Sequence, residues 1–215
     1  MSKRLRAYEG SGITVTYDSK RCIHAAECVR GLGQVFDPKA RPWINPDAAT
    51  PDDVAAVVRR CPTGALSYEY AAEAGAPAAP TPSEFTVIAD GPIYVHGNVA
   101  LQTADEAEVR ESRLALCRCG ASTNKPYCDN SHSEVPFEDP GLILREGGDE
   151  VVADGDLTLS PVADGPILLR GPFTIISADG SRVFCGEKAA LCRCGESANK
   201  PFCDGAHKSI GFRTS

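Results

Sequence analysis

Hydrophobic and polar residues follow two different periods in the first part of the chain. Residues 12–18, GITVTYD, alternate as a strand with one buried face does. Residues 50–61, TPDDVAAVVRRC, instead have apolar side chains at helical spacing, namely Val54, Val57, Val58 and Cys61. Thr50 stands at the N-cap position, Pro51 at the first helical position, and Asp53 completes a capping-box pattern. The pattern predicts a strand and then a capped helix that carries Cys61 on its buried stripe.

The chain changes character at residues 71–84, AAEAGAPAAPTPSE, which are rich in Ala and Pro and have no periodic apolar pattern. Such a composition predicts a semi-stiff linker. After it the sequence repeats itself: Asp-Gly-Pro-Ile stands at 90–93 and again at 164–167, and strand-like apolar segments follow at 93–101 and 167–176. A duplication of this length indicates two copies of one small unit.

These patterns divide the chain into two differently built parts and predict an α+β protein. The first part should be a small α+β domain. The second should be mainly β, since each copy of the repeat reads as a short sheet that carries a cysteine-rich loop. We expect an N-terminal domain, a linker, the first repeat, a connector and the second repeat at residues 1–70, 71–84, 85–138, 139–160 and 161–215.

Composition and charge exclude some classes of protein. Of 215 residues, 42% are hydrophobic, as in ordinary soluble proteins, and no stretch approaches the roughly 18 apolar residues that span a bilayer. The formal net charge is -7 without a basic stripe, so we expect no nucleic-acid partner. The start, MSKRLRAYEG, leads into no apolar run typical of an export signal, which predicts a cytoplasmic protein. Ten cysteines in that compartment indicate metal binding or redox work rather than disulfides.

The repeated segment carries three cysteines and one histidine at a fixed spacing, Cys-x-Cys-x8-Cys-x3-His, in both copies. The first two cysteines are two residues apart, so on an extended chain both thiols point to the same side. The spacing of the third cysteine and the histidine suits a turn that enters a helix. Each copy thus offers four metal ligands: Cys117, Cys119, Cys128 and His132 in the first, and Cys192, Cys194, Cys203 and His207 in the second.

Two kinds of metal centre fit these ligands. One is a tetrahedral zinc ion held by three cysteines and a histidine. The other is a two-iron cluster, with a cysteine pair on one iron and a cysteine and the histidine on the other. The spacing alone does not distinguish them. Structural zinc sites use C-x2-C pairs more often than C-x-C pairs, which favours iron and sulfide here.

The segments CRCGASTNKPYCDNSH and CRCGESANKPFCDGAH resemble the CDGSH iron-sulfur domain of the mitoNEET family, and the resemblance extends over residues 85–215. It implies a [2Fe-2S] cluster on each set of three cysteines and one histidine. The copies depart from the motif at Asn130 and Ala206, which are not ligands, and Asn tolerates a left-handed backbone where the motif has glycine. Two motifs in one chain imply that the repeats pack as an intrachain pseudo-dimer and that the protein is a monomer.

The N-terminal cysteines follow another pattern, with Cys22 and Cys28 in RCIHAAEC and Cys61 in CPTGAL. They resemble the single-cluster ferredoxins, and above all the divergent ferredoxin-like domain found beside CDGSH motifs, although an alanine stands at the place of the middle cysteine. Three thiolates suit a [3Fe-4S] cluster. A [4Fe-4S] cluster needs a fourth ligand, for which His24 is the nearest candidate, one residue before the vacant position.

Three ligand sets in one chain predict a multi-cluster iron-sulfur protein that exchanges electrons with a redox partner protein. An alternative is a cluster donor, or a redox or iron sensor, that serves an apo iron-sulfur acceptor, because a single histidine ligand makes each repeated site sensitive to pH. A third is a zinc-stapled interaction module. No paired acids and no nucleophile with its base stand out in the sequence, so we predict no enzyme activity.

Overall fold

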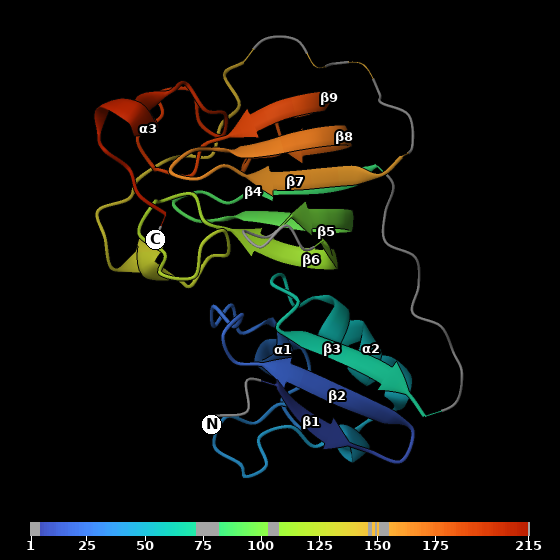
Figure 1. Ribbon diagram of the computed structural model, residues 1–215. Coiled ribbons are helices and arrows are strands. Elements are labelled where there is room, and N and C mark those ends of the chain that lie inside the picture. The colour runs from blue at the N-terminus through green and yellow to red at the C-terminus, as the bar shows by residue number, and fades with distance from the viewer. Residues whose placement is uncertain are drawn as a thin grey trace. The chain divides into compact units, whose positions relative to one another are not determined.

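The computed structural model describes residues 5–71, 82–102, 108–145, 148, 150 and 155–214, as Figure 1 shows. The chain divides into two compact units, Met1–Ala78 and Ala79–Ser215. Most of the regular structure is strand, with a few short helices, which confirms the predicted α+β class. The predicted linker lies largely outside the described residues, and because a strand begins at Ser83 it ends before the predicted residue 84. Among the described residues, no helix is long enough and apolar enough to cross a membrane.

The first unit is a three-stranded antiparallel sheet with helices packed against it. The strand order is β1, β2, β3, and the strand predicted at residues 12–18 is the central one. The elements are β1 (Leu5–Glu9), β2 (Ile13–Asp18), α1 (Glu27–Gly31), the 3-10 helix η1 (Pro46–Ala48), α2 (Pro51–Arg59) and β3 (Leu66–Tyr70). The predicted apolar stripe of α2 is buried, and it packs in one cluster with Ile13 and Val15 of the central strand.

Helix α2 begins as the sequence predicts. The Thr50 hydroxyl accepts a hydrogen bond from the Asp53 N–H at 3.3 Å and donates one to the Asp53 carboxylate at 2.7 Å. The helix ends at Arg59, however, so the prediction that Cys61 lies on its buried stripe is wrong. Cys61 precedes Pro62, and helical backbone is disfavoured for the residue before a proline. This cysteine therefore lies in the loop beyond the helix.

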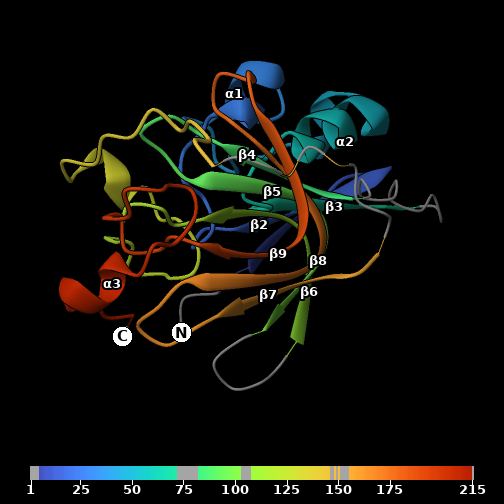
Figure 2. The same ribbon diagram turned by 90° about the horizontal axis from the view of Figure 1, so that it is seen from above.

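The second unit is a six-stranded sheet to which both repeats contribute (Figure 2). Its elements are β4 (Ser83–Val87), β5 (Ile93–Gln102), β6 (Glu108–Leu116), the 3-10 helix η2 (Ser131–Ser133), β7 (Leu157–Pro161), β8 (Ile167–Ile176), β9 (Val183–Leu191) and α3 (Ala206–Ser209). Strand β4 pairs antiparallel with β5 and parallel with β8 of the other repeat. Strand β7 pairs antiparallel with β8 and parallel with β5. The long strand of each repeat is therefore bordered by strands from both halves of the unit.

The two long strands change partner at an irregularity near their middle. The register shifts between His96 and Val99 in β5, and between Arg170 and Phe173 in β8. Before the shift β5 pairs with β4, and after it with β7. A bulge of this kind bends a strand, so one strand can serve two neighbours. The loops that follow β6 and β9 then lie at the same end of the sheet (Figure 1).

One hydrophobic core serves both repeats, since its buried side chains come from all six strands. The Phe173 ring of β8 lies 6.1 Å from the Phe85 ring of β4 and 6.4 Å from the Phe184 ring of β9, measured between centroids. A segment as short as one repeat buries little apolar surface by itself. Each repeat therefore depends on the other for its core.

Candidate metal centres

The first candidate centre lies in the loop that follows β6. Cys117 and Cys119 continue the extended chain beyond the strand, and their sulfur atoms are 3.9 Å apart. Cys128 returns beside them, since its N–H donates to the Ala115 carbonyl at 2.8 Å. His132, in η2, turns its Nδ1 toward the Cys128 sulfur at 3.4 Å. The four predicted ligands of the first repeat thus stand as two close pairs.

The loop after β9 has the same arrangement. The sulfur atoms of Cys192 and Cys194 are 3.7 Å apart. The N–H of Cys203 donates to the Ala190 carbonyl at 2.8 Å, and the Nδ1 of His207, in α3, lies 3.4 Å from the Cys203 sulfur. The turn into a short helix that the spacing predicts is therefore present in both repeats.

These separations fit pairs of ligands on one tetrahedral metal. Two sulfurs that are each about 2.3 Å from such an ion lie roughly 3.8 Å apart, and a sulfur and a histidine nitrogen lie roughly 3.6 Å apart. The sulfur pairs at 3.9 and 3.7 Å and the sulfur–nitrogen pairs at 3.4 Å come close to these values. The four ligands of each repeat therefore form two pairs, and two pairs fit the two irons of a binuclear cluster.

Burial and hydrogen bonds set the protonation of the ligands. A hydrogen bond from the Cys117 thiol, together with backbone N–H groups, lowers the pKa of Cys119 to about 6 in spite of burial. Burial raises the pKa of Cys128 to about 11, so metal binding there must release a proton. Burial lowers the pKa of His132, and the charge of Arg118 lowers it further. The imidazole is therefore kept neutral, the form that binds a metal.

An aspartate carboxylate accepts hydrogen bonds within each cysteine loop, and it accepts more of them in the first repeat. The Asp129 carboxylate accepts hydrogen bonds from the N–H and hydroxyl of Thr123 at 2.8 and 2.9 Å. It also accepts them from the N–H and hydroxyl of Ser131 at 3.1 and 2.6 Å. Asp204 accepts N–H hydrogen bonds at 2.8 and 3.0 Å from the two alanines at the equivalent positions. Because alanine has no hydroxyl, the second loop lacks the two hydrogen bonds that hydroxyl groups donate in the first.

Replacing Asp129 by asparagine should destabilise the protein more than the matching change at Asp204. Burial alone would raise the pKa of Asp129, but hydrogen bonds from Ser131 and Thr123 lower it to about 2. The ionised carboxylate therefore adds stability above its unfolded pKa, about 3.9, and this stability is lost as the pH falls through about 2. At pH 7 we expect Asp129→Asn to lower the free energy of unfolding by about 1–2 kcal/mol and Asp204→Asn by less.

Thermal melts of the two aspartate variants at pH 7 and in acid measure this difference. The gap between Asp129→Asn and the unaltered protein should narrow as the pH is lowered toward 2, because the unaltered carboxylate then becomes protonated. If both variants lost the same stability at pH 7, the hydroxyls of Thr123 and Ser131 would not contribute as proposed.

The residue after each aspartate has a left-handed backbone. Its φ is 76° at Asn130 and 93° at Gly205. Both residues stand at the N-cap of the short helix that carries the histidine. This confirms the expectation that Asn accommodates the left-handed conformation at the place of the motif's glycine.

The two cysteine loops touch back to back. The backbone is left-handed at Gly120, with φ of 80°, and at Gly195, with φ of 88°. A methyl carbon added at Gly195 would stand 2.6 Å from the carbonyl oxygen of Cys119, and one added at Gly120 would meet the carbonyl oxygen of Cys194. Backbone of each loop thus packs on backbone of the other, directly beside a cysteine pair.

Two buried arginines, which the sequence prediction missed, anchor the loops. Arg118, between the first two cysteines of its motif, donates from Nε to the Gly91 carbonyl at 2.8 Å and forms an ion pair with Asp139. Arg193 has the same place in the second motif and donates from Nε to the Gly165 carbonyl at 2.9 Å. Each accepting glycine belongs to the repeated Asp-Gly-Pro-Ile. Because Cys-Arg-Cys and Asp-Gly-Pro-Ile are both repeated, the sequence did contain a signal that each arginine contacts the glycine of its own repeat.

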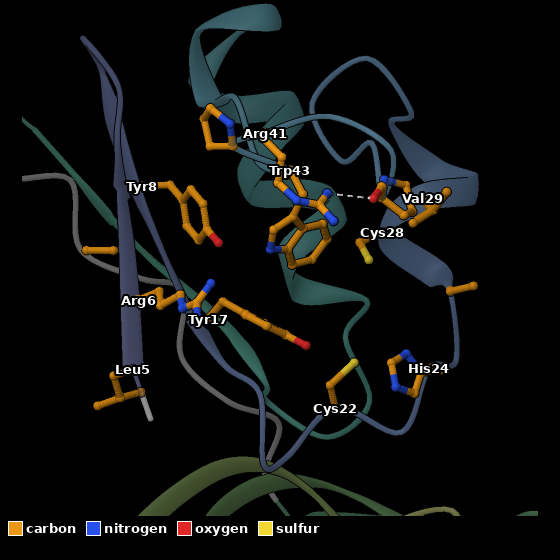
Figure 3. Close-up of a pocket in the computed structure, with 14 residues that line it drawn as sticks. Leu5, Arg6, Tyr8, Tyr17, Cys22, His24, Cys28, Val29, Arg41 and Trp43 are labelled. Carbon is orange, nitrogen blue, oxygen red and sulfur yellow. Dashed lines mark hydrogen bonds between the residues drawn. The ribbon is translucent and has the colours of Figure 1, made fainter. Parts of the chain in front are cut away.

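The N-terminal cysteines converge on one small cavity of the first unit. Cys22 lies in the loop after β2, Cys28 in α1 and Cys61 beyond α2, and all three line this cavity together with Tyr17 and Trp43. Figure 3 shows the sulfur atoms of Cys22 and Cys28 directed toward the same space. Burial raises the pKa of Cys28, and the two other thiols raise it further. The three predicted ligands are therefore brought together.

His24 is not among the residues that line this shared cavity. It is exposed, its φ is 56°, and it lines the wider cleft shown in Figure 3. The cavity that the three cysteines share is lined by other residues. The assignment of His24 as a fourth ligand therefore stays a prediction.

Comparison with known proteins matches both parts of the chain. Residues 8–71 match the family described as divergent 4Fe-4S mono-cluster, and residues 90–133 and 164–208 match the family described as iron-binding zinc finger, CDGSH type. The uncharacterized protein YjdI of Escherichia coli (strain K12) is 42% identical over 65 residues, which are 30% of this chain and 86% of that protein. YjdI of Escherichia coli O157:H7 matches to the same extent. No solved structure matches the chain.

Proposed function

The chain belongs to the divergent 4Fe-4S mono-cluster family and carries two CDGSH-type iron-binding domains behind that domain, and on this premise we propose that it is a multi-cluster electron carrier. Iron-sulfur clusters supply one-electron chemistry when bound. We propose a [2Fe-2S] cluster in each CDGSH domain, and a [3Fe-4S] or [4Fe-4S] cluster on Cys22, Cys28 and Cys61. The proposed partner is a redox protein.

The observation that carries this proposal is the pairing of ligands in both CDGSH domains. Each domain has two sulfur atoms 3.9 or 3.7 Å apart, and a sulfur and a histidine nitrogen 3.4 Å apart. A zinc-stapled module would need all four ligands around one ion. Two separate pairs support two irons per domain instead.

The histidine of each pair has one nitrogen for the metal and one for a proton. Because Nδ1 faces the neighbouring cysteine sulfur in both domains, we assign Nδ1 to iron and leave Nε2 for a proton. A neutral imidazole in place of a thiolate makes the site one charge less negative, which favours uptake of an electron. Protonation at Nε2 then couples that uptake to pH.

We further propose that the two CDGSH domains act as an intrachain pseudo-dimer in a monomeric protein. The crossed pairing of β4 with β8 and of β7 with β5 supports this, as does the core that both repeats share. The contact of Gly195 with Cys119 places the two cysteine loops side by side, which supports electron exchange between them. Light scattering should give the mass of one chain, and the mass of two chains would contradict the proposal.

Iron and acid-labile sulfide analysis with electron paramagnetic resonance (EPR) tests the cluster content. We expect about seven or eight iron atoms per chain, reduced signals of two-iron type, and a separate signal from the N-terminal cluster. Cys61→Ala should remove only the N-terminal signal. Cys185→Ala is the matched control, since Cys185 belongs to none of the three ligand sets, and it should remove none. Iron-free protein that contains zinc would contradict the proposal.

A second candidate function is donation of clusters to an apo iron-sulfur acceptor. It is favoured by the histidines, because His132 and His207 are only half-buried and acid competes with iron for an imidazole nitrogen. Mixing the loaded protein with an apo-ferredoxin should then move clusters faster at mildly acidic pH than at neutral pH. Absence of transfer at every pH and redox state would exclude this candidate and leave electron transfer.

A further inference from the structure

A wide cleft opens in the first unit beside the N-terminal cysteines (Figure 3). Its volume is about 1020 Å³, at the upper end of the roughly 300–1,000 Å³ typical of small-molecule sites. Cys22 and Cys28 line part of its wall. The smaller cavity that also includes Cys61 measures only about 30 Å³, so a cluster on the three cysteines would extend into the neighbouring part of the cleft. Arg6, Tyr8 and Arg41 line the cleft and not the smaller cavity, and the part of the cleft that they border has room for a separate ligand.

Aromatic side chains form one wall of the cleft. Trp43 meets Tyr17 edge-on, with ring centroids 4.9 Å apart, and Tyr8 in the same way at 6.3 Å. All three rings are half-buried and line the cleft. Rings fixed by their neighbours, with part of their surface open, offer a rigid apolar support for a flat ring. Figure 3 shows the three rings grouped on one side of the space.

Positive charge borders the same space. Arg6 and Arg41 line the cleft, and among its described lining residues there is no aspartate or glutamate. This contrasts with a chain whose formal net charge is -7. Arg41 donates from one guanidinium nitrogen to the carbonyls of Pro38 and Ala40, at 3.0 and 2.6 Å, which holds this side chain in place at the cleft. The charge favours an anion at this place.

We propose that the cleft is a binding site for a small aromatic anion, a flat ring that carries a phosphate or a carboxylate. The ring lies against Trp43 and Tyr8, and the anionic group lies at Arg6 and Arg41, where charge-assisted hydrogen bonds can hold it. This site goes beyond electron transport by the chain. Binding there uses Trp43, Tyr8, Arg6 and Arg41, none of which is a predicted cluster ligand, so the site can be tested separately from the proposed electron transport.

Isothermal titration calorimetry on the full-length protein, with its iron content measured in parallel, tests the site. The probes are flavin mononucleotide, riboflavin, which has the same ring without the phosphate, and 2-naphthoate, a ring with a carboxylate. We expect saturable binding of one anionic probe per chain and much weaker binding of riboflavin. Binding of flavin mononucleotide alone assigns a phosphate ligand, and binding of 2-naphthoate alone assigns a carboxylate.

Arginine variants locate the binding. Arg41→Gln should weaken the anionic probe about tenfold, the loss expected for one charge-assisted hydrogen bond. Because Arg41 also contacts backbone carbonyls, Arg6→Gln provides an independent variant with the same expected direction. Arg59→Gln is the matched control, since Arg59 contacts Tyr68 outside the cleft and should leave the affinity unchanged.

Two results would overturn the site. One is the absence of saturable binding of both anionic probes. The other is that Arg41→Gln and Arg6→Gln bind the probe as tightly as the control Arg59→Gln. Binding that persists in protein without iron would support the site, whereas the iron content measured in parallel tests the proposed clusters, so the two proposals fail separately.

Discussion

Gly195→Ala is expected to lower the free energy of unfolding by about 2–5 kcal/mol and to accelerate loss of iron from both CDGSH domains. Two physical effects add at this position. The backbone is left-handed, with φ of 88°, a conformation that is unfavourable for any residue with a Cβ atom. The new methyl group would also stand 2.6 Å from the carbonyl oxygen of Cys119, a backbone atom that can move only with the other cysteine loop. A shift of that loop displaces Cys119 itself.

Gly205→Ala separates the two effects. Gly205 lies in the same repeat and has φ of 93°, but an added Cβ there would meet nothing within 4 Å. This control should therefore lose only the conformational part, about 1–2 kcal/mol. Thermal melts followed by visible absorbance compare the variants, and Gly195→Ala should melt roughly 5–10 °C below Gly205→Ala. Coincident melting curves would show that the two loops are not in backbone contact.

His207→Cys is expected to lower the reduction potential of the second CDGSH domain by on the order of 200 mV. The substitution replaces a neutral imidazole by a thiolate, so the site gains a negative charge and an added electron becomes less favourable. It also removes the nitrogen that takes up a proton on reduction. In the unaltered protein, reduction raises the proton affinity of the imidazole, so the potential should rise as the pH falls, by up to about 59 mV per pH unit.

Potentiometric titrations followed by EPR at several pH values test this prediction. The potential of the second domain in His207→Cys should hardly change with pH, while that of the first domain keeps its slope because His132 is intact. His132→Cys is the matched variant: here the potential of the first domain should hardly change with pH, and that of the second should keep its slope. If the reduction potential stayed high in both variants, the histidines would not be ligands. If the potential of the altered domain still changed with pH, a group other than the histidine would take up the proton.

The local patterns of the sequence predicted several of the elements and the pairs of ligands within each loop. Periodicity found β2, β8 and the start of α2, because strands and capped helices depend on neighbouring residues. The fixed spacing of cysteines and histidines put Cys117 next to Cys119 and Cys128 next to His132, because a C-x-C strand end and a four-residue turn bring side chains together over a short range. The end of α2 was missed where Pro62 interrupts the helix before Cys61.

Only the tertiary structure decided which distant segments meet. The exchange of strands between the repeats, the seating of Arg118 on the Gly91 carbonyl and the contact between Gly195 and Cys119 all join residues that are far apart in the chain. The same is true of the cleft, where Arg6 and Tyr8 border Trp43 without any motif that links them. Short-range geometry can be read from spacing, whereas long-range contacts arise from packing one buried core, and no local pattern encodes which partner completes it.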